Sequence, residues 1–512
     1  MHGHEITIST RRALRAALLF VPIALMTVGL AQRDVTVAVT SDPQSMDPYV
    51  SATSGTVTAV NHIFDNLVQR DPLTMEIVPA LATSWEITDD SVYEFSLREG
   101  VRFHNGDPFT AQDVVFSFAR MREPGFEAMG NYVRPLIDRV EALDDHTVRI
   151  TLVAPYAPFL NRLPTFYIVP AAYTSTVGDE AFAEAPIGTG PYRFVEWVHG
   201  NHWTFEAFSE HWAGAPAVER VTFRPIPEAS TRIAALLSGA VDIIEQVNLP
   251  DVPRLEADPG VRVEAVNDNR IYFYAFQSRR PPFDDPQVRR ALSYAVDWDE
   301  ILGIFDGYAF RVPLPGLPTD FGYADYIEDL QPLLPTYDPE MARALLAEAG
   351  YPDGLTTTIQ ASSGNYPKDA ELAQAVANEL ARVGVDAEVR VSEWAVYLSD
   401  VWRGGNVEGM GFFSMGNPLF DPDHLFTVHF DPEGGGQYYN SPELTELGNR
   451  GRVVTDPEQR ATIYRDMMQY MIVNQPYLWT HGVQQVYAMR ADIDWMPRAD
   501  NRIFMEEVSF RD

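Results

Sequence analysis

Strand-like and helix-like patterns are mixed along the whole chain, so the fold must combine both kinds of element. Residues 93–97 alternate apolar and polar side chains, which is typical of a half-buried strand. Aspartate caps the first amides of a helix, and a proline at the first helical position loses no donor that the helix needs. We therefore expect helices to begin at three Asp-Pro pairs: Asp285-Pro286, Asp338-Pro339 and Asp456-Pro457.

Composition excludes several classes of protein. The 512 residues are 46% hydrophobic and 12% aromatic, which suits a globular chain of two or three domains. A net charge of −34 argues against binding to nucleic acid or to an anionic membrane surface. Lys368 is the only lysine, and the other 37 basic residues are arginine, which we interpret as a coding bias. The lack of cysteine excludes disulfides, thiol nucleophiles, cysteine-ligated metals and a lipid anchor on cysteine.

The first 31 residues resemble an export signal. Three arginines within residues 11–15 precede an apolar stretch over 16–30, and small residues at Gly29 and Ala31 suit a cleavage site. The alternative is a membrane anchor, but the apolar run is short for a span of about 20 residues and contains Pro22. We expect cleavage after Ala31, export by the Sec or twin-arginine route, and a soluble mature protein in the periplasm.

The sequence contains no common catalytic or metal-binding motif. The chain has no G-x-S-x-G elbow, HExxH pair or Walker loop, and Gly188-Thr189-Gly190-Pro191 lacks the third glycine of a dinucleotide fingerprint. His424 and His429 lie near Asp421 and Asp423, but their spacing matches no common ligand pattern. We therefore expect no catalytic residue, no cofactor and no metal.

Segments distributed over nearly the whole chain carry a family resemblance. They are Ser45-Met46-Asp47-Pro48, Leu81–Phe118, Pro186–Tyr192, Val288–Ala295, Tyr337–Gly350 and Tyr439–Leu444. In this order they resemble bacterial extracellular solute-binding proteins of family 5, the peptide/nickel-type receptors of ABC importers.

The resemblance implies an α/β periplasmic-binding-protein fold of type II, in which two hinged lobes close on a ligand like a flytrap. The first lobe would comprise residues 32–65, 186–270 and 479–512, with an extra subdomain, residues 66–185, inserted into it. The second lobe would span residues 271–478. The two chain crossings that form the hinge would lie near Asn269–Phe276 and Gln475–His481.

The implied function is capture of a peptide-like or other polar organic solute and its delivery to permease subunits in the inner membrane. The receptor would be a monomer without enzymatic activity. Oligosaccharides, opines and metal chelates are alternative ligands, and presentation of a ligand to a sensor is an alternative to import. A secreted hydrolase is the rival from another class, although it has no motif to support it.

The resemblance also suggests where the ligand binds. Peptide-binding members carry an aspartate at the position of Asn417, three residues after an aromatic that is Ser414 here, and that aspartate pairs with the α-ammonium of the peptide. Because Asn417 supplies no charge, we expect a ligand without an unshielded cation there, unless Asp421 or Asp423 substitutes. The remaining candidates are Met415 in the same segment, Trp394, and the turn Ala52-Thr53-Ser54 before a helix expected from Val57. Core packing is the alternative for Trp394, and an ordinary turn is the alternative for residues 52–54.

Overall fold

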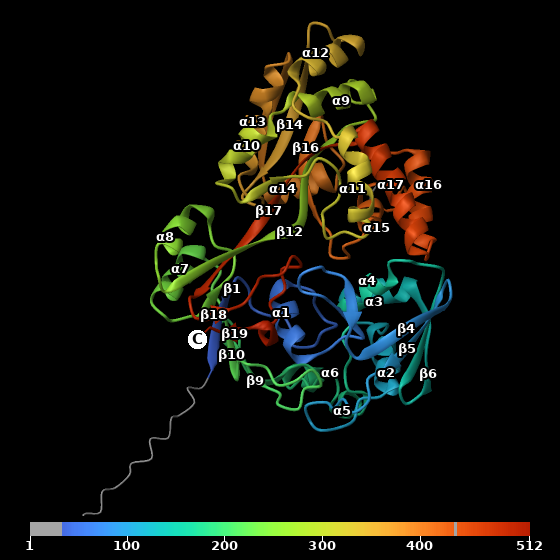
Figure 1. Ribbon diagram of the computed structural model, residues 1–512, viewed down its shortest axis with the longest axis vertical. Coiled ribbons are helices and arrows are strands. Elements are labelled where there is room, and N and C mark those ends of the chain that lie inside the picture. The colour runs from blue at the N-terminus through green and yellow to red at the C-terminus, as the bar shows by residue number, and fades with distance from the viewer. Residues whose placement is uncertain (1–32, 435–437, 512) are drawn as a thin grey trace, which may run out of the picture.

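The computed structural model describes residues 33–434 and 438–511, which form two lobes (Figure 1). The blue to green part of the chain builds the lower lobe, and the yellow and orange parts build the upper one. The expected two-lobed α/β architecture is therefore confirmed. The predicted signal peptide, residues 1–31, lies outside the described residues.

One mixed sheet extends through both lobes. In the described chain its order is β15-β14-β16-β12-β17-β11-β1-β10-β9-β8, and β13 pairs with β17. Its strands are β1 (Asp34–Val39), β8 (Tyr192–Val198), β9 (His202–Ala207), β10 (Arg220–Pro225), β11 (Ile243–Ile244), β12 (Val261–Phe276), β13 (Ala309–Arg311), β14 (Leu355–Ser363), β15 (Val385–Glu393), β16 (Met410–Gly416) and β17 (Tyr477–Arg490).

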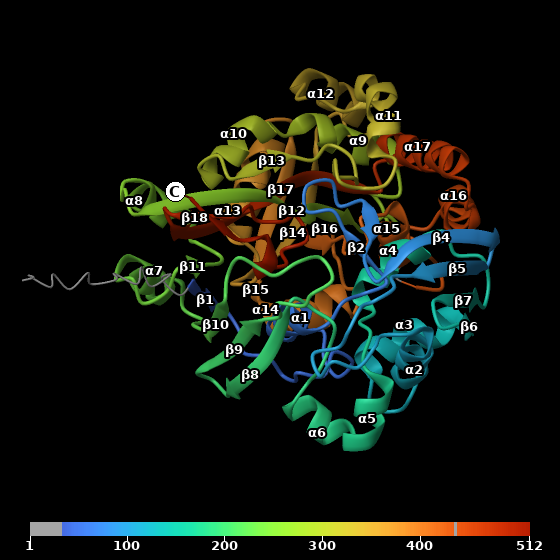
Figure 2. The same ribbon diagram turned by 60° about the horizontal axis from the view of Figure 1, so that its bottom comes forward.

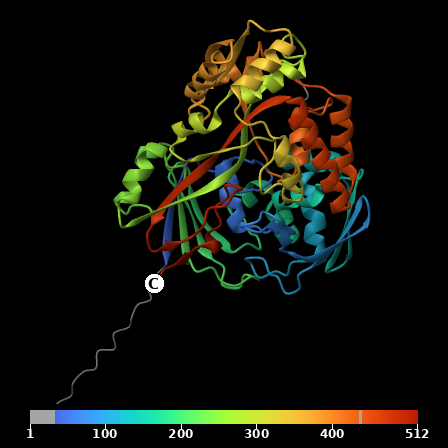
Figure 3. The same cartoon turned by 45° about the horizontal axis from the view of Figure 1, so that its top comes forward.

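The two long strands β12 and β17 connect the lobes, as Figures 1 and 3 show. Their pairing is antiparallel, and its register shifts between Asn267 and Ile271. Up to Asn267 the pair lies beside β11, whereas from Arg270 onward β12 also pairs with β16. Both predicted crossings fall on or next to these strands. The register shift between Asn267 and Ile271 overlaps the start of the first predicted crossing.

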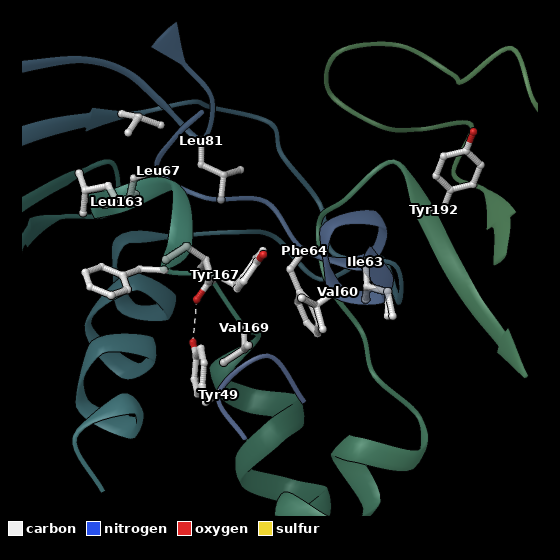
Figure 4. Packing of buried hydrophobic residues seen from close by; sticks show 14 of the residues in the cluster. Tyr49, Val60, Ile63, Phe64, Leu67, Leu81, Leu163, Tyr167, Val169 and Tyr192 are labelled. Atoms are coloured by element: carbon white, nitrogen blue, oxygen red, sulfur yellow. Dashed lines mark hydrogen bonds between the residues drawn. The ribbon is translucent and has the colours of Figure 1, made fainter. Parts of the chain in front are cut away.

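The first lobe buries its core beneath α1 (Ser54–Ile63). Figure 4 shows Val60, Ile63 and Phe64 packed near Tyr167, whose backbone carbonyl accepts a hydrogen bond of 2.7 Å from the hydroxyl of Tyr49. Burial of these apolar side chains stabilises the lobe by removing their surface from water. Helices α7 (Ala229–Leu237) and α8 (Val252–Glu256) and the terminal strands β18 (Ile493–Asp494) and β19 (Ser509–Phe510) complete this part.

A separate antiparallel sheet, of order β4-β5-β7-β6, forms the inserted subdomain (Figure 2). Tyr93, Phe95 and Leu97 are buried on one face of β5, so the predicted alternating strand is confirmed. The elements from residue 68 to 184 are β2 (Val68–Arg70), β3 (Ile77–Pro79), β4 (Ala82–Asp89), β5 (Val92–Leu97), α2 (Ala111–Met121), α3 (Glu127–Leu136), β6 (Ile137–Asp144), β7 (Thr147–Leu152), α4 (Phe159–Arg162), α5 (Ala171–Val177) and α6 (Asp179–Glu184).

Helices cover both faces of the sheet in the second lobe. Tyr274 and Phe412 belong to the core on one face, and Phe273 and Phe413 belong to the core on the other. This arrangement follows from the two-residue period of strands β12 and β16. The helices are α9 (Pro286–Ala295), α10 (Trp298–Leu302), α11 (Tyr323–Leu330), α12 (Pro339–Glu348), α13 (Asp369–Ala381), α14 (Trp394–Tyr397), α15 (Pro422–His429), α16 (Pro442–Val453) and α17 (Pro457–Asn474).

The three predicted Asp-Pro helix starts are confirmed at α9, α12 and α17. The side chains of Asp285, Asp338 and Asp456 each accept a hydrogen bond from an amide two or three positions further along the chain. Asp421-Pro422 starts α15 in the same way, because Asp421 Oδ1 accepts from the amide of Asp423 at 3.0 Å.

Gly188 lies where two backbone segments approach too closely for any side chain. A Cβ atom at this position would stand 1.9 Å from the carbonyl oxygen of Ile63, at the end of α1. The Gly188-Thr189-Gly190 motif is therefore required for packing against α1. It is not part of a phosphate-binding loop.

We expect Gly188→Ala to lower the free energy of unfolding by about 1–3 kcal/mol, the usual cost of overpacking. Gly303→Ala is the control, because a Cβ there meets no atom within 4 Å. Urea unfolding of both variants measures the difference. Equal stability of the two variants would contradict the proposed packing role of Gly188.

Candidate ligand-binding site

A cleft of about 1180 Å³ lies between the lobes beside the crossing strands. This volume is on the scale of a drug-sized or small peptide ligand. On the first-lobe side its lining includes Gln246, Asn248, Asp251, Asp268, Gln484 and Gln485. On the second-lobe side it includes Arg270, Tyr272, Tyr308, Tyr366, Lys368 and Trp394.

Aromatic rings form one wall of this cleft. The ring of Tyr366 lies edge-on to Tyr272, with centroids 5.7 Å apart, and edge-on to Trp394, with centroids 5.4 Å apart. Burial raises the pKa of the Tyr366 and Tyr272 hydroxyls, so both stay protonated and can donate hydrogen bonds. Such a wall can stack on the apolar parts of a solute and also hydrogen-bond its polar parts.

One predicted ligand-binding residue lines this cleft, and a second contacts a residue of its lining. Trp394 lines it directly and is half-buried at the start of α14, where Glu393 caps the helix by accepting from the amide of Ala395. Ser414 accepts a hydrogen bond of 2.8 Å from Nη1 of the cleft residue Arg270. Met415, the next residue on β16, is buried in the core on the opposite face of the sheet.

The turn at residues 52–54 is exposed and is not part of the lining described above. Helix α1 begins at Ser54, so the expected start at Val57 was three residues too late. Thr53 is the N-cap residue, and its hydroxyl contacts Thr56 at 3.2 Å instead of an amide. A ligand contact from Ala52, Thr53 or Ser54 stays a prediction.

Asn417 is only 4% exposed and is held by protein groups. Its Nδ2 donates to Oδ1 of Asp320 at 2.9 Å and to the backbone carbonyl of Asp421 at 3.2 Å. Its Oδ1 is buried and has no hydrogen-bond partner among the described residues. A role of this amide in ligand binding stays a prediction.

Asp421 is fully buried and accepts hydrogen bonds on both carboxylate oxygens. Its Oδ1 pairs with Nη2 of Arg460 at 2.7 Å and also accepts from the hydroxyl of Tyr464, while its Oδ2 accepts from Nδ2 of Asn161 at 3.1 Å. Asn161 belongs to the inserted subdomain, as does Tyr156, which donates to Asp423 at 3.0 Å. The segment around Asp421 therefore faces the inserted subdomain, and its carboxylates serve contacts within the protein.

We expect the buried carboxyl group of Asp320 to make the stability of the protein depend on pH. Burial raises its pKa to about 7, and the nearby carboxylate of Asp421 adds to this effect, although a hydrogen bond from the amide of Leu317 opposes it. An unfolded aspartate titrates near about 3.9, so between about pH 4 and pH 7 the folded state binds more protons here than the unfolded state. The contribution of Asp320 to stability is therefore fully present below about pH 4 and is lost as the pH rises through about 7.

We expect Asp320→Asn to remove this slope, so that the variant gains stability relative to the wild type as the pH rises from about 4 to about 7. Urea unfolding at several pH values across this window tests the expectation. Asp353→Asn, at an exposed position, serves as the control. A constant difference between Asp320→Asn and the wild type at every pH would contradict it.

His424 and His429, the two histidines near Asp421, serve packing within the protein. His429 is 1% exposed, and its ring lies edge-on to Phe273 at 5.1 Å. Burial lowers the pKa of His429 to about 3 and that of His424 to about 4, so both are neutral. Within residues 33–434 and 438–511, no group of three or more possible ligands could hold a metal ion.

Several cleft residues were not predicted from the sequence, namely Arg270, Tyr272, Tyr308, Tyr366 and Lys368. Arg270 and Tyr272 lie on the predicted crossing strand, and this position could have indicated a place in the cleft. Lys368, the only lysine, which composition alone attributes to a coding bias, lies in the lining of the cleft.

This fold, with a cleft lined from both lobes, defines a two-lobed solute-binding protein. Residues 76–437 match the family model described as "Bacterial extracellular solute-binding proteins, family 5 Middle". The chain belongs to this family, whose members bind solutes for ABC importers without converting them chemically. No helix in the described part of the chain is both long and apolar enough to cross a bilayer.

Relatives named for different solutes resemble the chain. Heme-binding protein A of Haemophilus influenzae is 33% identical over 81% of this chain and 80% of its own. The glutathione-binding protein GsiB of Pectobacterium atrosepticum is 31% identical over 88% of each chain. Among solved structures, the periplasmic binding protein DppA of Helicobacter pylori in complex with the peptide STSA is 29% identical, covers 94% of this chain and 98% of its own, and has a TM-score of 0.70.

Proposed function

We propose that this protein captures a peptide-like solute in the interlobe cleft and delivers it to the permease of an ABC importer. The observation that carries the proposal is the cleft of about 1180 Å³, which has aromatic side chains on one wall and amide side chains on the other. Backbone and side-chain polar groups of a short peptide suit such amides, and its apolar parts suit stacking on the rings. The relatives named for peptides and for the tripeptide glutathione support this class of ligand.

We also propose how the chain is divided between the two lobes and in which compartment the protein acts. Residues 32–65, 186–270 and 479–512 would move as one lobe together with the inserted residues 66–185, and residues 271–478 would form the other lobe. The mature chain would act as a monomer in the periplasm after removal of residues 1–31. The break in the β12–β17 register supports a boundary near residue 270.

Native mass spectrometry of protein purified from the periplasm tests this function. We expect a complex with a small molecule whose fragmentation contains amide-linked amino acids. Two outcomes would overturn the proposal: a bound sugar, opine or metal chelate in its place, or hydrolysis of the captured solute by the purified protein.

A further inference from the structure

The inserted subdomain contacts the second lobe at a place outside the cleft. Residues 156–161 run into α4, residues 419–423 run into α15, and Figures 1 and 2 show these two helices close together. None of these residues belongs to the lining of the cleft. Any attraction between the two segments therefore joins the lobes through protein groups alone.

Two buried carboxylates of the second lobe are held in place by arginines of the same lobe. Oδ1 of Asp421 accepts a hydrogen bond of 2.7 Å from Nη2 of Arg460. Oδ1 of Asp423 accepts a hydrogen bond of 2.9 Å from Nε of Arg452. Charge-assisted hydrogen bonds of this kind fix the direction of each carboxylate, and the second oxygen of each is available to another donor.

The inserted subdomain supplies this second donor to each carboxylate. The hydroxyl of Tyr156 donates to Oδ2 of Asp423 at 3.0 Å. Nδ2 of Asn161 donates to Oδ2 of Asp421 at 3.1 Å. Both donors belong to half-buried side chains. Each carboxylate therefore pairs with its own lobe through one oxygen and with the inserted subdomain through the other.

Main-chain carbonyls extend the same contact. The amide of Ala157 donates to the carbonyl of Arg452 at 2.8 Å. Nη2 of the buried Arg70, in β2, donates to the carbonyl of Leu419 at 3.0 Å and to the carbonyl of Asn161 at 2.8 Å. The guanidinium of Arg70 therefore connects the two segments directly.

These hydrogen bonds cross from one lobe to the other, so they require the lobes to be together. The two segments lie to the right of the crossing strands in Figure 1, and opening about those strands would separate them. In the open state water would replace each lost partner, whereas a carboxylate oxygen that is buried on closing without its donor would lose water and gain nothing. The contact therefore contributes its free energy to the closed state alone.

We propose that residues 156–161 and 419–423 form a latch, which favours the closed arrangement of the lobes without touching the solute. This inference rests on the proposed function, because it uses the division of the chain in which the inserted subdomain moves with the first lobe. It goes further by naming groups outside the cleft that set the ratio of closed to open molecules. Because the solute binds the closed state, weakening the latch would lower its apparent affinity.

The lack of cysteine in the chain allows a direct test. Asp138→Cys in β6 and Glu446→Cys in α16, both at exposed positions, place one spin label on the inserted subdomain and one on the second lobe. Electron paramagnetic resonance then measures the distances between the labels in protein without added solute. We expect Tyr156→Phe and Asn161→Ala, each introduced into this background, to raise the ratio of longer to shorter distances about tenfold, the effect of one hydrogen bond to a charged group.

Two substitutions serve as matched controls. Tyr173→Phe removes a hydroxyl that donates to the carbonyl of Ala185 at 2.9 Å, within the inserted subdomain. Asn406→Ala removes an amide that donates to Asp400 at 2.6 Å, within the second lobe. Neither hydrogen bond crosses between the lobes, so both controls should give the distances of the labelled wild type. Urea unfolding checks that every variant is folded.

Calorimetry with the dipeptide Met-Leu and with glutathione measures the consequence for binding. Tyr156→Phe and Asn161→Ala should weaken binding of these peptides by up to about tenfold, which is the expected change in the ratio of closed to open molecules. The two controls should leave the affinity unchanged.

The outcomes separate the latch from the proposed function. Equal distances in the wild type, Tyr156→Phe and Asn161→Ala would overturn the latch. One fixed distance in every protein, with and without peptide, would also overturn it, because the inserted subdomain would then move with the second lobe. Hydrolysis of the peptides would overturn the proposed function, whereas the distances measured without peptide would still decide the latch.

Discussion

Asp421→Ala is expected to lower the free energy of unfolding by about 3–5 kcal/mol, because it leaves the guanidinium of Arg460 buried without its partner. Arg460 is 4% exposed and its Nη2 lies 2.7 Å from Asp421 Oδ1. The substitution also removes the cap of α15 and the contact with Asn161 of the inserted subdomain. Urea unfolding monitored by tryptophan fluorescence measures the loss.

Asp456→Ala is the matched control for this prediction. Asp456 also caps a helix that begins with Asp-Pro, but its side chain is exposed and has no buried arginine as a partner. Loss of this cap should cost about 1 kcal/mol. If Asp421→Ala cost no more than Asp456→Ala, the ion pair would contribute little, and a ligand-binding role for Asp421 would regain support.

The second large effect is expected on ligand affinity. Tyr366→Ala removes the ring that contacts both Tyr272 and Trp394, so it should open the aromatic wall and weaken solute binding by about 2–4 kcal/mol, the range of a buried aromatic anchor. Calorimetry with the solute identified from the periplasm measures this change.

Tyr337→Ala provides the comparison for Tyr366→Ala. Tyr337 is 41% exposed and lies outside the cleft lining, so its loss should leave the affinity unchanged. Equal affinities of the wild type and Tyr366→Ala would place the solute elsewhere on the protein.

The sequence predicted the local structure well where a short pattern has one physical outcome. Asp285-Pro286 and the two similar pairs start helices, because the cap and the fixed proline backbone act within one turn. The same pattern at Asp421-Pro422 could have identified Asp421 as a cap. The family resemblance instead suggests a ligand anchor at Asp421, where the structure shows a helix cap and a buried ion pair.

The binding site was less predictable than the fold. The family resemblance indicates which strand end approaches the cleft, but it does not indicate which way each side chain points. On β16, Ser414 contacts the cleft residue Arg270, whereas Met415 enters the core of the other face, as the two-residue period of a strand requires. Lys368 comes from the loop before α13, and only the folded structure brings it beside the aromatic wall.

We expect a solute that binds between the lobes to hold them closed. A ligand shifts a two-state equilibrium only if it binds one state more tightly, and a solute that contacts both lobes binds the closed state better. Small-angle X-ray scattering of the mature protein, with and without its native solute, measures this most directly. We predict a smaller radius of gyration when the solute is bound, and an unchanged radius at saturation would contradict the account.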